Sequence, residues 1–110
     1  MSDRKPQLRR WCSELVSVIC RHDDGRVHKV FGNLEEIGSS SALVLTESGI
    51  RPGTKVVVDC KQHQLKGVVQ SRSLDEHLGF FVEIRFNAES HWSQRRFTPE
   101  HLLPHFKVPA

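Results

Sequence analysis

The chain has 110 residues, of which 37% are hydrophobic and 26% charged, and its formal net charge is +3. This length and composition predict one compact domain with a modest core, and they exclude a disordered protein or an elaborate two-domain enzyme. No apolar run reaches the roughly 18 residues that span a bilayer, and the N-terminus lacks the apolar core of a signal peptide. We therefore expect a cytoplasmic protein with no membrane partner.

The excess positive charge lies in the first ten residues. Four of the 16 basic residues but only one of the 13 acidic residues fall there, so the rest of the chain is neutral. The four are Arg4, Lys5, Arg9 and Arg10. We predict a basic N-terminal arm over residues 1–10, followed by a domain over residues 11–106. Nucleic-acid-binding folds spread their basic residues over a face of the fold, so a DNA- or RNA-binding barrel is the weakest of the alternatives.

Six segments alternate between apolar and polar residues, which is the period of a half-buried β-strand. They cover residues 11–20, 26–37, 42–47, 54–60, 63–74 and 78–86. Turn signals such as Asp23-Asp24-Gly25 and Pro52-Gly53 separate them. Six strands with short connections in so short a chain predict a mainly β protein, a six-stranded antiparallel barrel, because closure protects the edge strands.

The C-terminal stretch has a different character. Thr98 is a candidate N-cap and Pro99 suits the first helical position, so we predict a short helix over residues 98–103. We expect Trp92, Phe97 and Phe106 to dock this tail onto the barrel. The alternative is an exposed aromatic patch that contacts a protein partner.

Motifs for metal binding and catalysis are lacking. The three cysteines are irregularly spaced, which argues against a disulfide framework. Cys60 and His63 offer two of the four ligands that structural zinc needs, and Cys60 continues an alternating strand. No nucleophile elbow, phosphate-binding glycine loop or metalloprotease helix occurs. We expect no enzyme activity, no metal and no cofactor.

The order of segments carries a family resemblance. A basic arm precedes a strand, a D-D-G turn, a strand ending GNLEEI, a small-residue turn GSSSA, a P-G-T turn before KVVVDC, and the closing strand LGFFVEIRF. This succession resembles the PilZ domain, a family of six-stranded barrels whose typical members bind the bacterial second messenger cyclic di-GMP. The resemblance covers roughly residues 4–103.

In ligand-binding PilZ domains two motifs hold the dinucleotide, R-x-x-x-R in the arm and D/N-x-S-x-x-G in the loop. Guanidinium groups suit phosphates and guanine edges, and small loop residues allow a close approach. This chain offers Lys5-x-x-x-Arg9 with Arg10 adjacent, and Glu36-x-Gly38-x-x-Ser41. The resemblance therefore implies a ligand site made of Lys5, Arg9, Arg10, Glu36, Gly38 and Ser41.

The chain departs from both motifs. Lysine at position 5 lacks the planar fork of arginine, and we expect Ser41 to strain a backbone suited to glycine. A second register, Asn33-x-Glu35-x-x-Gly38, keeps Asn and Gly but lies inside a predicted strand.

Two functions follow from the resemblance. The first is a signalling receiver for cyclic di-GMP, in which the arm closes on the loop at residues 36–41. The alternative is a degenerate module that does not bind the dinucleotide and acts through contacts with an unknown protein partner.

Overall fold

A computed structural model describes residues 7–61 and 63–108, and in this range the chain is mainly β. The strands are β1 (Gln7–Arg21), β2 (Val27–Gly38), β3 (Ser41–Thr46), β4 (Lys55–Cys60), β5 (His63–Asp75), β6 (Gly79–Phe86) and β7 (His105–Val108), and a 3-10 turn covers Ala88–Ser90. The six predicted strands are confirmed. The short strand β7 was not predicted.

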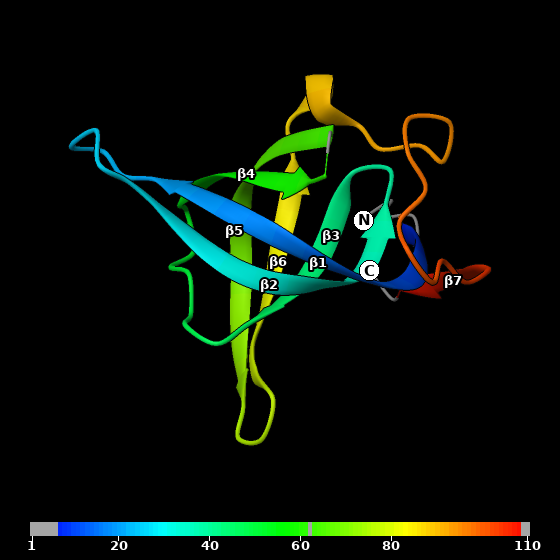
Figure 1. The fold of residues 1–110 in the computed structure, drawn as a ribbon, viewed down its shortest axis with the longest axis horizontal. Coiled ribbons are helices and arrows are strands. Elements are labelled where there is room, and N and C mark those ends of the chain that lie inside the picture. Colours follow the sequence, from blue (N-terminus) through cyan, green and yellow to red (C-terminus); the bar gives the residue numbers. More distant parts are fainter. Residues whose placement is uncertain (1–6, 62, 109–110) are drawn as a thin grey trace, which may run out of the picture.

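The first six strands form a closed antiparallel barrel (Figure 1). Neighbours follow the order β2-β3-β6-β5-β4-β1, and a further pairing of β1 with β2 closes the ring. The predicted six-stranded barrel is therefore confirmed. Closure gives each of the six strands a neighbour on both sides, although not along its whole length.

Strand β1 connects the arm to the barrel. Its last residues, from Ser17 to Arg21, pair with β4, whereas its first residues, from Gln7 to Arg10, pair with β7. Along its other side β1 pairs with β2, and the register shifts between Trp11 and Glu14. Such a bulge bends a strand and increases its twist. The last four residues of the predicted arm thus belong to β1.

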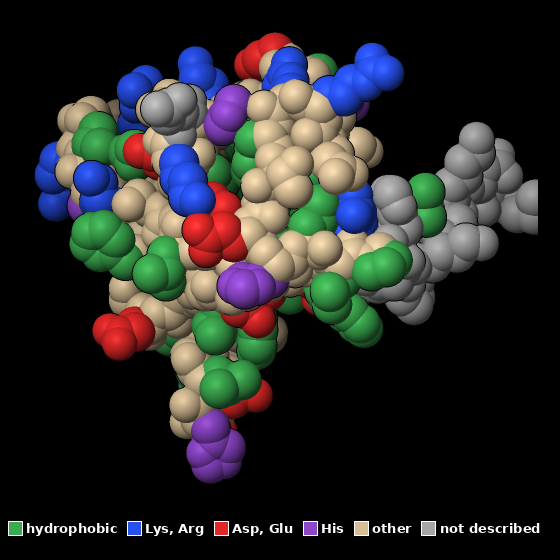
Figure 2. Space-filling model, turned by 45° about the vertical axis from the view of Figure 1, so that its right-hand side comes forward, with side chains coloured by type: hydrophobic (Ala, Val, Ile, Leu, Met, Phe, Trp, Pro, Cys, Tyr) green, Lys and Arg blue, Asp and Glu red, His purple; other side chains and the backbone are tan. Residues whose placement is uncertain are grey.

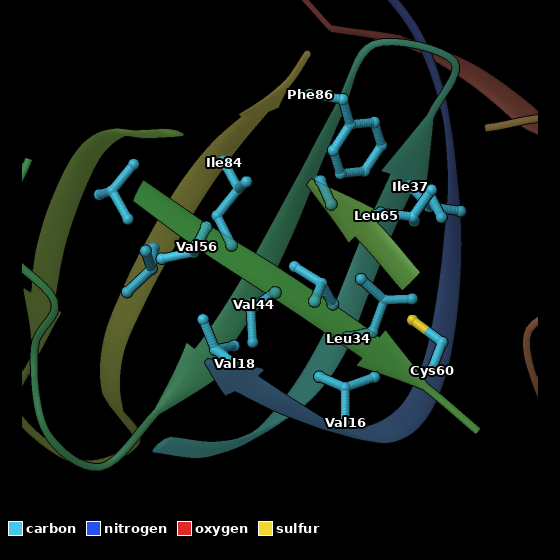
Figure 3. Packing of buried hydrophobic residues seen from close by; sticks show 14 of the residues in the cluster. Val16, Val18, Leu34, Ile37, Val44, Val56, Cys60, Leu65, Ile84 and Phe86 are labelled. Carbon is cyan, nitrogen blue, oxygen red and sulfur yellow. The ribbon is translucent and has the colours of Figure 1, made fainter. Parts of the chain in front are cut away.

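Alternate side chains of the strands fill the barrel (Figure 3). Val18, Leu34, Val44, Val58 and Ile84 are fully buried, as expected for the inward positions of alternating strands. The three cysteines are also buried and unpaired by disulfides. The apolar interior supplies the main stabilisation of the fold.

The predicted helix over residues 98–103 is wrong, because this segment is an irregular turn. Its backbone bonds to β1 instead of to itself: Ser13 N donates to Glu100 O, and Leu103 N donates to Trp11 O. Glu100 N donates to the side chain of Glu14 at 3.0 Å. These partners replace the i→i−4 bonds that a helix would make.

The docking of the tail is confirmed at two of the three aromatic residues. Trp92 is buried, and Phe97 packs against the core cluster, with the two rings edge to face. The side chain of Phe106 lies outside the described residues.

Two hairpins project from the barrel, one joining β1 to β2 and the other joining β5 to β6 (Figure 1). In the described part of the chain, no helix has the length and apolar character needed to cross a membrane.

Candidate functional site

The structure brings the arm beside the loop, as the predicted site requires. Arg9 pairs with Gly38 and Arg10 pairs with Ile37 across the β1–β2 ladder. Gly38 allows this closeness, since a Cβ there would lie 2.7 Å from the carbonyl oxygen of Leu8. Lys5 lies outside the described residues.

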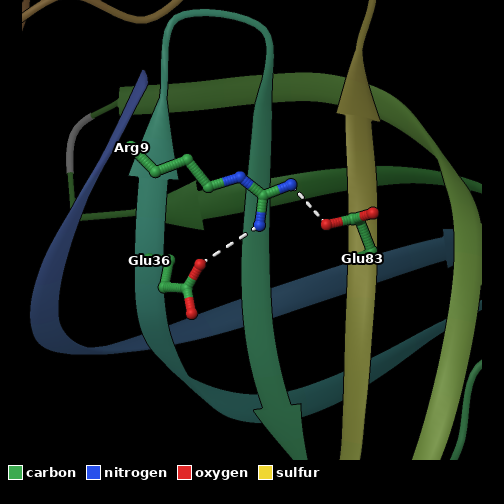
Figure 4. A network of polar contacts seen from close by, with 3 residues as sticks. All are labelled: Arg9, Glu36 and Glu83. Atoms are coloured by element: carbon green, nitrogen blue, oxygen red, sulfur yellow. Dashed lines mark hydrogen bonds and ion pairs between the residues drawn. The ribbon is translucent and has the colours of Figure 1, made fainter. Parts of the chain in front are cut away.

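The side chain of Arg9 lies across β3 and is held by two carboxylates, one on each neighbouring strand (Figure 4). Its side chain is only 3% exposed. One terminal nitrogen donates to Glu36 Oε1 at 3.2 Å, and the other donates to Glu83 Oε1. Glu36 comes from β2 and Glu83 from β6, so the guanidinium links three strands of the barrel.

This arrangement neutralises the arginine that the family motif assigns to the ligand. The two carboxylates are 20% and 30% exposed, so they are partly desolvated and interact more strongly with Arg9 than surface groups would. Each terminal nitrogen of Arg9 thus binds a carboxylate of the protein, in the place that an anionic group of a ligand would take. The predicted site includes Glu36 but not Glu83, which lies 74 residues from Arg9 in the sequence.

Arg10 is bound by the C-terminal segment. Its Nε donates to Leu103 O and its Nη1 donates to Gln94 Oε1, both at 2.7 Å. A pocket of about 280 Å³ lies between Arg10, Gly38 and Trp92. The amide of Trp92 donates to the carbonyl of Ser39, so the same segment also covers the loop.

Ser41 begins β3 and is buried, with its backbone paired to Arg85. The expectation of strain at this residue is wrong. Among the described non-glycine residues, Lys61 and His101 have left-handed backbones and Ser41 does not. Serine is therefore compatible with this position, because the strand keeps the backbone extended.

A second buried charge, Glu14, was missed by sequence analysis. Its side chain is 4% exposed, its Oε1 accepts the bond from Glu100 N, and its Oε2 is buried with no hydrogen-bond partner among the described residues. A signal was present in the sequence. In WCSELVSVIC, Glu14 occupies the same alternating positions as Cys12, Val16 and Val18, which are core-facing.

A pocket of about 400 Å³ adjoins this carboxylate. It is lined by Glu14, Cys60, Lys61, His63, Phe97 and Thr98. The rings of His63 and Phe97 stack with centroids 4.9 Å apart, and together they form an aromatic wall. Burial raises the pKa of the Cys60 thiol to about 12, with a further contribution from the negative charge of Glu14. Cys60 is therefore not a nucleophile at neutral pH.

Neither the predicted site nor the pocket beside Glu14 groups described side chains in the way that a metal site requires. Over residues 7–61 and 63–108, no three side chains of His, Cys, Asp or Glu come together as metal ligands would. Glu14, Cys60 and His63 line the same pocket, but among the described residues these side chains do not come together as a group of metal ligands.

Apolar side chains also reach the surface, as the face drawn in Figure 2 illustrates. Leu15 on β1 is 82% exposed and Phe31 on the neighbouring strand β2 is 73% exposed. Both border a hollow of about 690 Å³ that Leu78 lines from the β5–β6 turn. Lys29 and Glu47 lie at the same hollow and give it charges of both signs.

Comparison of the chain with protein-family models, with curated proteins and with solved structures finds no match. The resemblance to the PilZ family stays a prediction based on the motifs and their order.

Proposed function

We propose that this chain is a signalling module of the PilZ type that acts through contact with a protein partner and not through cyclic di-GMP. The observation that carries the proposal is the burial of Arg9 between Glu36 and Glu83. The motif arginine is used to hold the barrel together. The C-terminal segment further engages Arg10 and the loop.

Binding of a dinucleotide through Arg9 would be unfavourable. The guanidinium would have to leave two partly buried carboxylates, and breaking such pairs costs several kcal/mol (about 3–5 when one partner is removed). Glu36 and Glu83 would then face the two phosphates of the ligand, which adds repulsion between like charges.

The surface around Leu15 and Phe31 suits a protein partner. Leu15 and Phe31 are diagonal neighbours on β1 and β2, and exposed apolar side chains that border one hollow are typical of interaction sites. The hollow between them and Leu78 would receive an apolar side chain. Lys29 and Glu47 at its border would orient a partner that carries the complementary charges.

Calorimetric titration with cyclic di-GMP tests the first half of the proposal. At about 100 μM protein and ligand a micromolar site would be well populated, and we expect no heat from the unaltered protein. The double variant Glu36→Gln, Glu83→Gln removes both negative charges from Arg9. Heat of binding from this variant, but not from the unaltered protein, would support a dinucleotide site that is blocked by the protein's own carboxylates. Heat from the unaltered protein would overturn the proposal.

Site-specific photo-crosslinking in the cells of origin tests the second half. A crosslinker in place of Phe31 should give one discrete protein adduct, and Leu15→Ser should abolish it by removing the neighbouring apolar surface. A crosslinker in place of the exposed Gln70 on β5 serves as the control. Equal adducts at both positions, or an adduct unaffected by Leu15→Ser, would contradict a docking role for this face.

Cyclic di-GMP binding is the second candidate function. It is favoured by the β1–β2 register, which places Arg9 and Arg10 opposite Gly38 and Ile37, as a closed arm and loop would require. The same calorimetric titration decides between the two functions.

A further inference from the structure

Glu14 is a carboxylate in apolar surroundings, and only one of its two oxygens accepts a hydrogen bond from a described residue. It occupies a core-facing position of β1 beside the bulge, and it is 4% exposed. Its Oε1 accepts from Glu100 N at 3.0 Å, whereas no described residue donates to its buried Oε2. A buried charged acceptor without a donor costs more free energy than a buried neutral group without one. An unsatisfied buried oxygen such as Glu14 Oε2 is rare in folded proteins, and it indicates that a bound molecule supplies the missing hydrogen-bond donor.

The pocket beside Glu14 is large enough to hold such an occupant. Its volume of about 400 Å³ falls in the range of about 300–1,000 Å³ for small-molecule sites. Lys61, His63 and Thr98 are solvent-exposed and line it, so the pocket has an opening to solvent. Glu14 and the buried Cys60 line its inner part.

Glu14 has no ion-pair partner among the described residues, and Lys61 attracts its charge without pairing with it. Lys61 Nζ donates to Glu100 Oε1 at 2.8 Å, and this hydrogen bond raises the pKa of Lys61 and lowers that of Glu100. The ammonium of Lys61 is thus paired with Glu100 at the surface, and no ion pair joins it to Glu14. The remaining charge of the pocket is that of Glu14, which favours a cationic ligand.

The geometry distinguishes between the two common organic cations. A guanidinium binds a carboxylate best through both oxygens at once, but Oε1 of Glu14 is already bonded to the Glu100 amide. An ammonium is a compact charge with three donors, and a single free oxygen can accept a hydrogen bond from one of them. The rings of His63 and Phe97 stack on each other and line the pocket, so they add apolar surface for a hydrocarbon stem.

We propose that this pocket binds a primary ammonium group on an apolar stem, with Glu14 Oε2 as its acceptor and Phe97 with His63 as its wall. The ammonium donates to Oε2, and the stem lies between the aromatic wall and the opening at Thr98. A free alkylamine and a lysine side chain of another protein share this chemistry.

Titration with n-butylammonium, followed by amide chemical shifts, tests the site. We expect saturable shifts at Cys60, Lys61, His63 and Thr98, with a dissociation constant of about 1 mM as befits a fragment of five non-hydrogen atoms. n-Butanol, which has the same stem without the charge, should bind at least about tenfold more weakly because it leaves the carboxylate uncompensated. Absence of shifts at about 20 mM n-butylammonium, at which a millimolar site is nearly saturated, would overturn the proposal.

Two variants locate the binding group. Glu14→Gln keeps an oxygen for the Glu100 amide and removes the charge, so affinity should fall at least about tenfold. Glu76→Gln makes the same chemical change at an exposed turn residue and should leave affinity unchanged. Equal binding by the Glu14→Gln protein would overturn the proposal.

A third variant avoids the core altogether. Thr98→Phe adds bulk at an exposed position at the pocket opening, so it should block binding while Glu14 remains in place.

Tighter binding of methylguanidinium than of n-butylammonium would overturn the one-oxygen geometry. Comparison of n-butylammonium with Nα-acetyl-lysine methylamide identifies the source of the ammonium group. Tighter binding of n-butylammonium indicates a free amine, and tighter binding of the lysine derivative indicates a lysine side chain of another protein.

Discussion

Arg9 and Glu14 are charged residues on the same strand, both buried, and they differ in how their charges are compensated. Arg9 contacts two carboxylates from β2 and β6, so its charge is matched within the barrel. Glu14 has one oxygen bonded to a backbone amide and one with no described donor. A matched buried charge stabilises a fold by linking its elements, whereas an unmatched one is typical of a binding site.

We expect Arg9→Ala to lower the free energy of unfolding by about 2–4 kcal/mol, because it leaves two partly buried carboxylates close together without a cation. Chemical denaturation measures this loss. Arg26→Ala is the matched control, since Arg26 pairs with Asp24 on the surface and should change stability by less than about 1 kcal/mol. A loss at Arg9 no larger than that at Arg26 would show that the buried pairs do not support the barrel.

At the scale of elements, β1 decides how the predicted site is built. Its N-terminal end is held between β2 and β7, and the C-terminal turn bonds to it through Ser13, Trp11 and Glu14. The N-terminal arm that the sequence predicts over residues 1–10 is therefore part of a sheet from Gln7 onward. A strand paired on both sides does not close on a ligand without losing backbone hydrogen bonds.

Gly38→Ala tests this fixed arrangement. The added Cβ would lie 2.7 Å from the Leu8 carbonyl oxygen, so β1 and β2 must separate there. We expect faster amide hydrogen exchange over residues 8–11 and a loss of about 1–3 kcal/mol in stability, as for other overpacked sites. Ser39→Ala, at the exposed neighbouring position, should leave both quantities unchanged. Unaltered exchange in the Gly38→Ala protein would mean that the arm strand adapts without separating.

At the scale of the whole molecule, the closed barrel keeps three thiols in its apolar interior. Burial raises the pKa of Cys12 and of Cys60 to about 12, and it also raises that of Cys20. Glu14 contributes a further rise at Cys12 and Cys60 through its negative charge. The unfolded chain releases these protons near the ordinary value of 9.0, so the folded state binds more protons at alkaline pH.

Stability should therefore fall as pH rises from about 9 to 12. The contribution of these thiols is fully present below pH 9, and it is lost with a slope of up to about 1.4 kcal/mol per pH unit for each thiol that stays protonated. Denaturation curves at pH 8, 9, 10 and 11 measure the slope. Cys60→Ala should reduce the slope, although it lowers stability at every pH by creating a cavity. An identical slope in the variant would show that the Cys60 thiol ionises in the folded protein as it does in the unfolded chain.

The core-facing positions of the strands were predictable, and the chemistry of the site was predictable only in part. Alternation places Val16, Val18 and Ile84 inside a barrel whatever the details of the turns. The motifs assign Arg9 and Gly38 to one site, and in the structure the two residues are paired across β1 and β2. It did not predict that Arg9 would bond to Glu83, because no local pattern relates residues 74 positions apart.

The sequence by itself determined the strands and their closure into a barrel, since both depend on the two-residue period and on short turns between neighbours. Tertiary structure decided what the polar residues do. The helix-forming residues 98–103 became a turn because β1 supplies their backbone partners. The charge of Arg9 became structural because closure of the barrel brings Glu36 and Glu83 to it. Local propensity is outweighed wherever distant groups satisfy the hydrogen bonds and charges of a segment.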